Sequence, residues 1–139
     1  MSHWRALCKV YFFKIIVKTY MASDKKMLLV AAGVAAQNQN RKFDNRSFLL
    51  GAVGQRNDGV FVSAKNIAAA DYAPGHHAET RLIRKLTPGS IVWVTRIARG
   101  DGAWALARPC SGCEMRLRAS GIKRVIYTIA PNEWGVIVF

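Results

Sequence analysis

Short apolar runs alternate with helical patterns from residue 48 to residue 139, and this alternation limits the fold more than any other feature. The strand-like runs are residues 48–53, 60–62, 91–94, 123–129 and 136–139, with a shorter run at 104–106 that can pair back on the strand before it. Helical patterns cover residues 23–35, 77–86 and 110–119. Strands that alternate with helices predict an α/β protein. We expect a three-layer α/β/α sandwich with a central mixed five-stranded sheet.

Two turn signals predict which strands are neighbours. Asn57-Asp58-Gly59 lies between two apolar runs and is typical of a hairpin. The polar stretch Pro131–Gly135 before the last run is too short to hold a crossover helix. The last two strands are therefore expected to form an antiparallel hairpin.

The first twenty residues differ from the rest of the chain. They contain Arg5, Lys9, Lys14 and Lys18 and no acidic residue. Their apolar run, residues 10–17, is broken by Lys14 and is shorter than the about 20 residues that a membrane span needs. Three interpretations of this segment stay open: an extra element packed on the domain, a weak amphipathic surface contact, or a start site placed upstream of the natural one. We favour the last, with residues 1–20 as a basic extension and residues 21–139 as one domain.

Composition narrows the classes of protein and partner. The chain has 139 residues, one domain's worth, and its three unevenly spaced cysteines argue against a secreted disulfide scaffold. We therefore expect a reducing, cytoplasmic location. The net charge is +13, and subtracting the four cations of residues 1–20 leaves +9. Such a charge predicts an anionic partner, either nucleic acid, a nucleotide phosphate or an acidic surface, unless the cations form only a solvated face.

Two short motifs carry the chemistry, and each opens a helical pattern. His77-Ala78-Glu79 begins one, and Pro109-Cys110-Ser111-Gly112-Cys113 begins the next. Cys110 and Cys113 are three residues apart, which places both sulfurs on one helical face, and a helix start stabilises thiolate. One imidazole and two thiolates fill three of the four positions around zinc, as in catalytic sites.

Glu79 can approach such a metal only if His77 lies at the very start of its helix, because side chains two apart do not normally share a face. Each motif alone has other interpretations. Cys-x-x-Cys also occurs in redox sites and as half of a structural zinc site, and His77 could be an ordinary buried histidine. The two motifs together are typical of zinc-dependent base deaminases, which is the interpretation we favour.

From about Ser47 to Val138 the sequence resembles the cytidine deaminase superfamily. Residues 48–52 (Phe-Leu-Leu-Gly-Ala) are similar to the Phe-x-Val-Gly-Ala strand of nucleoside deaminases, and residues 121–127 are similar to the strand entry after the Cys-x-x-Cys helix. The resemblance implies a deaminase-like catalytic domain over residues 21–139. It also implies a homo-oligomer, either a dimer or a tetramer.

The same resemblance implies roles for individual residues. One catalytic Zn²⁺ per chain is held by His77, Cys110 and Cys113, and Glu79 carries protons. Phe48 lines the substrate pocket and Asn66 contacts the sugar. We also expect Ala78, Arg108 and Trp134 to bind substrate.

The motifs match no single branch of the superfamily. Free-nucleoside deaminases usually have Cys-Ala-Glu where this chain has His77-Ala-Glu. The deoxycytidylate and tRNA-adenosine branch has His-Ala-Glu but usually Thr-Leu-Glu-Pro-Cys, whereas this chain has Leu106-Ala-Arg-Pro-Cys110. The expected terminal hairpin resembles the nucleoside branch, so the chain is a hybrid whose motifs do not set the size of the substrate.

Three functions therefore stay open. The first is conversion of cytosine to uracil in a small nucleoside or nucleotide: cytidine, deoxycytidine or dCMP. The second is deamination of cytosine or adenine within single-stranded DNA or RNA. The positive charge favours it, and so do five arginines near the expected site: Arg96, Arg99, Arg108, Arg116 and Arg118. Three aromatic residues could stack on an exposed base: Trp104, Tyr127 and Trp134. The third is a non-catalytic, zinc-containing nucleic-acid-binding domain, against which the presence of Glu79 argues.

Overall fold

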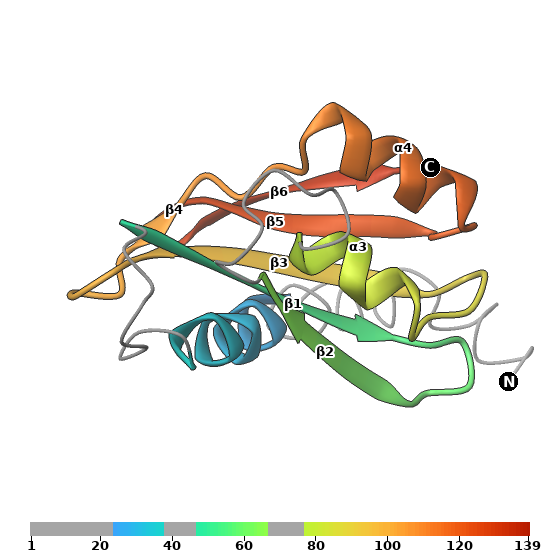
Figure 1. Ribbon diagram of the computed structural model, residues 1–139, viewed down its shortest axis with the longest axis horizontal. Coiled ribbons are helices and arrows are strands. Elements are labelled where there is room, and N and C mark those ends of the chain that lie inside the picture. The colour runs from blue at the N-terminus through green and yellow to red at the C-terminus, as the bar shows by residue number, and fades with distance from the viewer. Residues whose placement is uncertain (1–23, 38–46, 67–76) are drawn as a thin grey trace, which may run out of the picture.

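The computed structural model describes residues 24–37, 47–66 and 77–139, and these form one mixed sheet with helices packed on it (Figure 1). The strands are β1 (Phe48–Gln55), β2 (Phe61–Lys65), β3 (Ile91–Ala98), β4 (Trp104–Ala105), β5 (Arg124–Ala130) and β6 (Glu133–Val138). Their order is β2-β1-β3-β5-β6, and β4 pairs with β3 off this path. The predicted mixed sheet is confirmed, and β4 brings its strands to six.

Strand directions follow from the connections. β3 and β5 are parallel, since the chain crosses over between them through the helix α4 (Ser111–Ala119). The pairs β1–β2, β1–β3, β3–β4 and β5–β6 are antiparallel. The predicted terminal hairpin is therefore present.

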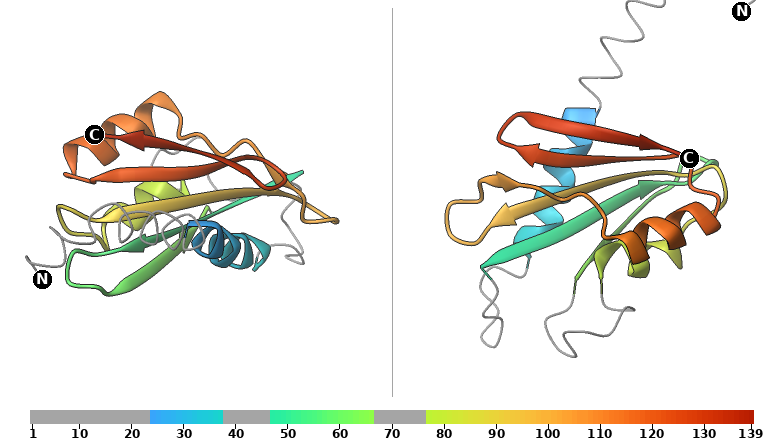
Figure 2. Two further views of the ribbon diagram at one scale, coloured as in Figure 1. Left: turned by 180° about the vertical axis from the view of Figure 1, so that it is seen from behind. Right: turned by 90° about the horizontal axis from the view of Figure 1, so that it is seen from above.

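Helices cover both faces of the sheet (Figure 2). On one face lies the helix of residues 24–36, whose Leu28 carbonyl accepts a hydrogen bond from Thr95 Oγ1 at 2.7 Å. Asp24 of this helix accepts a hydrogen bond from Trp93 Nε1 at 3.0 Å. The helices α3 (Ala78–Ile83) and α4 lie together on the other face. This arrangement confirms the expected three layers.

Several element boundaries differ from the prediction: β1, β2 and β3 extend further, and the last strand and α3 differ as follows. The last strand begins at Glu133 rather than Val136, because the hairpin turn needs only Pro131 and Asn132. Asn132 adopts φ 62°, a left-handed conformation that asparagine tolerates well. The helix expected over residues 77–86 ends at Ile83, and the next residues form hydrogen bonds three residues back, as in a tighter turn.

Some expectations fall on residues that the structure does not describe. These are the basic extension of residues 1–20, Cys8 and most of the polar stretch of residues 37–46. Within the described ranges, no helix is both long enough and apolar enough to cross a membrane.

Contact between the helix of residues 24–36 and β1 depends on Gly51, where a Cβ would lie 2.3 Å from the carbonyl oxygen of Ala31 and 2.6 Å from the amide nitrogen of Ala35. We expect Gly51→Ala to lower the free energy of unfolding by about 1–3 kcal/mol, because the backbone atoms that it meets cannot move without separating the two elements. Urea denaturation would measure the change.

Gly33→Ala is the matched control, since nothing lies within 4 Å of a Cβ at this exposed helix position. Gly33→Ala should raise stability by up to about 1 kcal/mol. Equal effects of the two substitutions would contradict the packing argument.

Candidate active site

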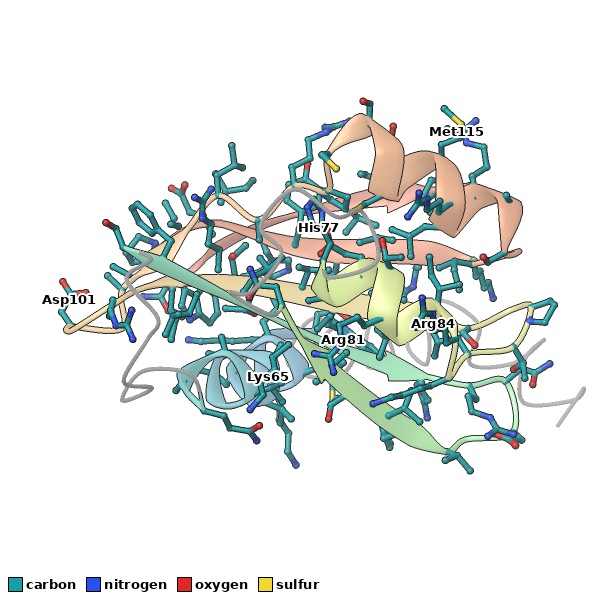
Figure 3. The ribbon with its side chains drawn as sticks, viewed as in Figure 1. Lys65, His77, Arg81, Arg84, Asp101 and Met115 are labelled. Atoms are coloured by element: carbon teal, nitrogen blue, oxygen red, sulfur yellow. The ribbon has the colours of Figure 1, made fainter. Side chains whose placement is uncertain are left out.

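Two helix starts form the centre of the site. His77 is the N-cap of α3 and Cys110 is the N-cap of α4, and both have extended backbone angles, with ψ of 145° and 163°. Extended N-caps turn their side chains out of the helical spiral, which lets His77 and Glu79 approach one point although they are two residues apart. Cys110 Sγ also accepts a hydrogen bond from the backbone N–H of Cys113 at 3.5 Å. Figure 3 shows His77 between the start of α3 and the segment that leads into α4.

The three predicted metal ligands lie together. His77 Nδ1 is 3.2 Å from Cys113 Sγ and 3.9 Å from Cys110 Sγ, and the ligand atoms of the three residues all lie within 4.8 Å of one another. A nitrogen and a sulfur bound to one tetrahedral zinc ion lie about 3.6 Å apart, from bond lengths of about 2.1 and 2.3 Å. The donor set and its spacing therefore fit zinc.

Glu79 lies beside this cluster with one oxygen unpartnered. Its side chain is 3% exposed, and within the part of the chain that the structure describes, Oε1 is buried without a hydrogen-bond partner. Burial raises the pKa of Glu79, although its own backbone N–H, His77 and Cys113 oppose the shift. A buried carboxylate oxygen with no partner lowers the stability of the fold. Such an oxygen therefore marks a place where a proton donor or a ligand belongs.

Cys113 lies deeper than Cys110. Burial raises the pKa of the Cys113 thiol to about 12, and the charge of Glu79 acts in the same direction. A bound divalent cation reverses this preference, since zinc binds thiolate rather than thiol. One cation would thus stabilise both anionic groups.

A pocket of about 420 Å³ opens over the cluster. Six of the predicted site residues line it: Phe48, Asn66, His77, Glu79, Arg108 and Cys110. The other lining residues are Ser47, Leu50, Arg96, Leu106 and Ala107. The pocket therefore joins the two helix starts to the beginning of β1, the end of β3 and the segment before Cys110.

Pairing between strands explains how Leu50 and Arg96 come to line the pocket. Leu50 and Arg96 are directly opposite each other on β1 and β3, so they point to the same face of the sheet. Phe48 shares that face because side chains alternate along a strand. This alternation could have indicated Leu50. Arg96 is one of the five arginines expected near the site, but its place on the pocket wall depends on the register between two strands, which the sequence does not give.

Two expected substrate residues are not among the residues that line the pocket. Trp134 packs with Trp93 and Ile126 in the layer under the helix of residues 24–36, and its ring meets Trp104 edge-on at 6.5 Å. We therefore withdraw Trp134 from the substrate site, because its place in β6 directs it into the core instead of the pocket. Ala78 stands between His77 and Glu79 and is fully buried, so a substrate contact by this residue stays a prediction.

The fold and the His-Cys-Cys cluster together define an α/β protein with an open pocket and a donor set that fits zinc. The family model "Cytidine and deoxycytidylate deaminase zinc-binding region" matches residues 21–129, and the chain belongs to this family.

Two solved structures share the fold. The cytidine deaminase from Burkholderia pseudomallei is 20% identical, with a TM-score of 0.55 over 78% of this chain and 90% of that one. The cytidine deaminase from Mycobacterium leprae is 22% identical, with a TM-score of 0.54 over 81% and 91%. A comparison with curated proteins gave no match.

Zinc affinity should rise with pH. The Cys113 thiol, with a pKa of about 12, is protonated in the metal-free protein at neutral pH and must lose its proton to bind the ion. Each proton displaced makes the apparent affinity about tenfold higher per pH unit. We expect at least that slope between about pH 6 and pH 8 in competition with a coloured chelator. An affinity independent of pH would contradict thiolate ligation by Cys113.

Proposed function

We propose that this protein is a zinc-dependent hydrolytic deaminase that converts cytosine to uracil in a nucleoside or nucleotide. The observation that carries the proposal is the buried, unpartnered Glu79 Oε1 beside three residues that fit zinc, at a pocket that can admit a base. Membership of a cytidine and deoxycytidylate deaminase family supports it.

The side chains divide the work of the reaction. His77, Cys110 and Cys113 would hold the ion. When bound, the ion lowers the pKa of its own water ligand to about 7. Glu79 Oε1 takes a proton from water and delivers it to the ring nitrogen and then to the departing amine. Water and the cytosine amine thereby become the uracil oxygen and ammonia. The raised pKa of Glu79 suits a group that must alternately accept and release a proton.

The pocket walls suit a pyrimidine ring with an attached sugar. Phe48, Leu50 and Leu106 give an apolar surface near the ion site. Asn66 Oδ1 accepts a hydrogen bond from the backbone N–H of Leu50 at 3.3 Å, which fixes the direction of the amide at the pocket edge. We assign the sugar contact to this amide.

A second candidate is deamination of cytosine within a single strand of nucleic acid. It is favoured by the net charge of +13 and by two exposed apolar side chains on the pocket lining, Phe48 (41% exposed) and Leu106 (53%). An unstacked base needs such surfaces.

A non-catalytic zinc domain is disfavoured, since a binding module has no need of a buried carboxylate at the metal. The dimer or tetramer stays a prediction.

A panel of substrates tests the proposed reaction. Zinc-loaded protein should release ammonia from at least one of cytidine, deoxycytidine, CMP, dCMP, single-stranded DNA and RNA. The product should be about 1 Da heavier than the substrate, because an oxygen replaces the amine. Absence of ammonia from every cytosine compound, with zinc shown to be bound, would overturn the proposal.

The substitution Glu79→Gln should leave zinc bound and lower kcat by about 10²–10⁴-fold, because the amide cannot carry the proton. Metal content and steady-state rates would be measured together. Glu133→Gln is the matched control, since Glu133 is exposed in β6 and lies outside the pocket lining. Near-normal turnover in Glu79→Gln would remove Glu79 from the proton path.

A further inference from the structure

Two arginines line the pocket, and each is placed against an aromatic ring. The guanidinium carbon of Arg96 lies 4.6 Å from the centre of the Phe48 ring, and that of Arg108 lies 5.8 Å from the centre of the Tyr127 ring. At these distances the ring attracts the cation and restricts its motion. The two cations are therefore held in place on the pocket wall.

Among the residues that the structure describes, few acceptors face the hydrogen-bond donors of these arginines. Arg96 donates to the carbonyl of Leu106 at 3.5 Å and, within the described ranges, has no carboxylate partner. Arg108 donates to Tyr127 Oη at 3.4 Å and lies 3.6 Å from Glu114, but its side chain stays 56% exposed. An arginine has five N–H donors, so both can still bind an anion in the pocket.

The support under Arg108 is built into the sheet. Tyr127 is nearly buried in β5, and Gly135 lies opposite it on β6. A Cβ at Gly135 would lie 2.7 Å from Tyr127 Oη, so the ring occupies the space that a side chain would fill. The position of the Tyr127 hydroxyl, and with it the direction of Arg108, is thereby fixed by the strand pairing.

The charges on this wall do not suit an uncharged substrate. Cytosine and its nucleosides carry no negative charge at neutral pH. Among the described lining residues Glu79 is the one carboxylate, and it is buried beside the ion site. Arginine is the side chain best suited to paired hydrogen bonds with phosphate oxygens. A phosphate attached to the sugar would meet the unused donors of both arginines.

We propose that Arg96 and Arg108 bind a phosphate, so that the substrate is a phosphorylated cytosine nucleoside rather than the free nucleoside. This inference rests on the proposed deaminase function and names its substrate class. The phosphate can belong to a mononucleotide or to a single strand, and in both cases the chemistry that the wall recognises is the same.

Binding to Glu79→Gln protein, loaded with zinc, tests the inference without turnover. Calorimetry would give the dissociation constants of deoxycytidine, dCMP and a short single-stranded oligodeoxynucleotide with one cytosine. We expect dCMP or the oligonucleotide to bind at least about tenfold more tightly than deoxycytidine, since each charged hydrogen bond adds about that factor or more. Adding Arg96→Gln or Arg108→Gln should reduce this preference by about tenfold.

The control variant adds Arg84→Gln to Glu79→Gln. Arg84 is exposed at the end of α3 away from His77 (Figure 3), so this variant removes the same charge outside the pocket and should keep the preference. Tighter binding of dCMP than of the oligonucleotide assigns the phosphate to a mononucleotide, and the reverse assigns it to a strand. Equal binding of deoxycytidine and its phosphorylated forms, or equal effects of Arg84→Gln and Arg96→Gln, overturns the inference.

Kinetics of the protein with Glu79 intact separate the two proposals. If deoxycytidine is deaminated at least as well as dCMP and the oligonucleotide, the phosphate inference fails while the deaminase function stands. If no cytosine compound is deaminated, the function fails, whatever the binding data show.

Discussion

A buried carboxylate and a buried thiol lie within the same small volume at the starts of two helices, and the organisation of the site depends on how their charges are compensated. Burial makes the ionised form of each unfavourable, and the charge of Glu79 makes the Cys113 thiolate less favourable still. His77 lies 3.2 Å from Cys113 Sγ and lowers the pKa of Glu79, but burial still raises that pKa. A divalent cation compensates both groups, and the spacing of the three ligand atoms fits one zinc ion.

The sheet creates this arrangement by placing α3 and α4 next to each other on one face. The order β1-β3-β5 with β3 and β5 parallel brings the helix that precedes β3 and the helix that precedes β5 to the same side. β3 and β5 pair only along their first halves, and β4 then takes the place beside β3. The Thr128 hydroxyl holds this division, since it accepts from Arg96 N–H at 3.2 Å and donates to the Ala105 carbonyl at 2.8 Å.

The sequence predicted the parts of the site that depend on local patterns. His77, Glu79, Cys110 and Cys113 are found in short motifs at helix starts, and the three ligands meet as the two motifs together indicated. What it could not predict depends on contacts between distant segments. The sequence placed Arg96 near the site, but its exact place on the pocket wall comes from its register opposite Leu50. Trp134 lies outside the pocket because its position on β6 points into the layer beneath. The same distinction holds for the fold, where the strands and layers were predicted but the end of α3 and the start of β6 were not.

The pocket is assembled from two parts that can change separately. The ion ligands and Glu79 come from the starts of α3 and α4. Most of the remaining wall comes from β1, β3 and the segment before Cys110. A substitution at an exposed wall position such as Arg96 or Leu106 leaves the ion ligands, Glu79 and the core residues in place. The wall can therefore change its ligand by single surface substitutions, while the residues at the two helix starts are inherited unchanged.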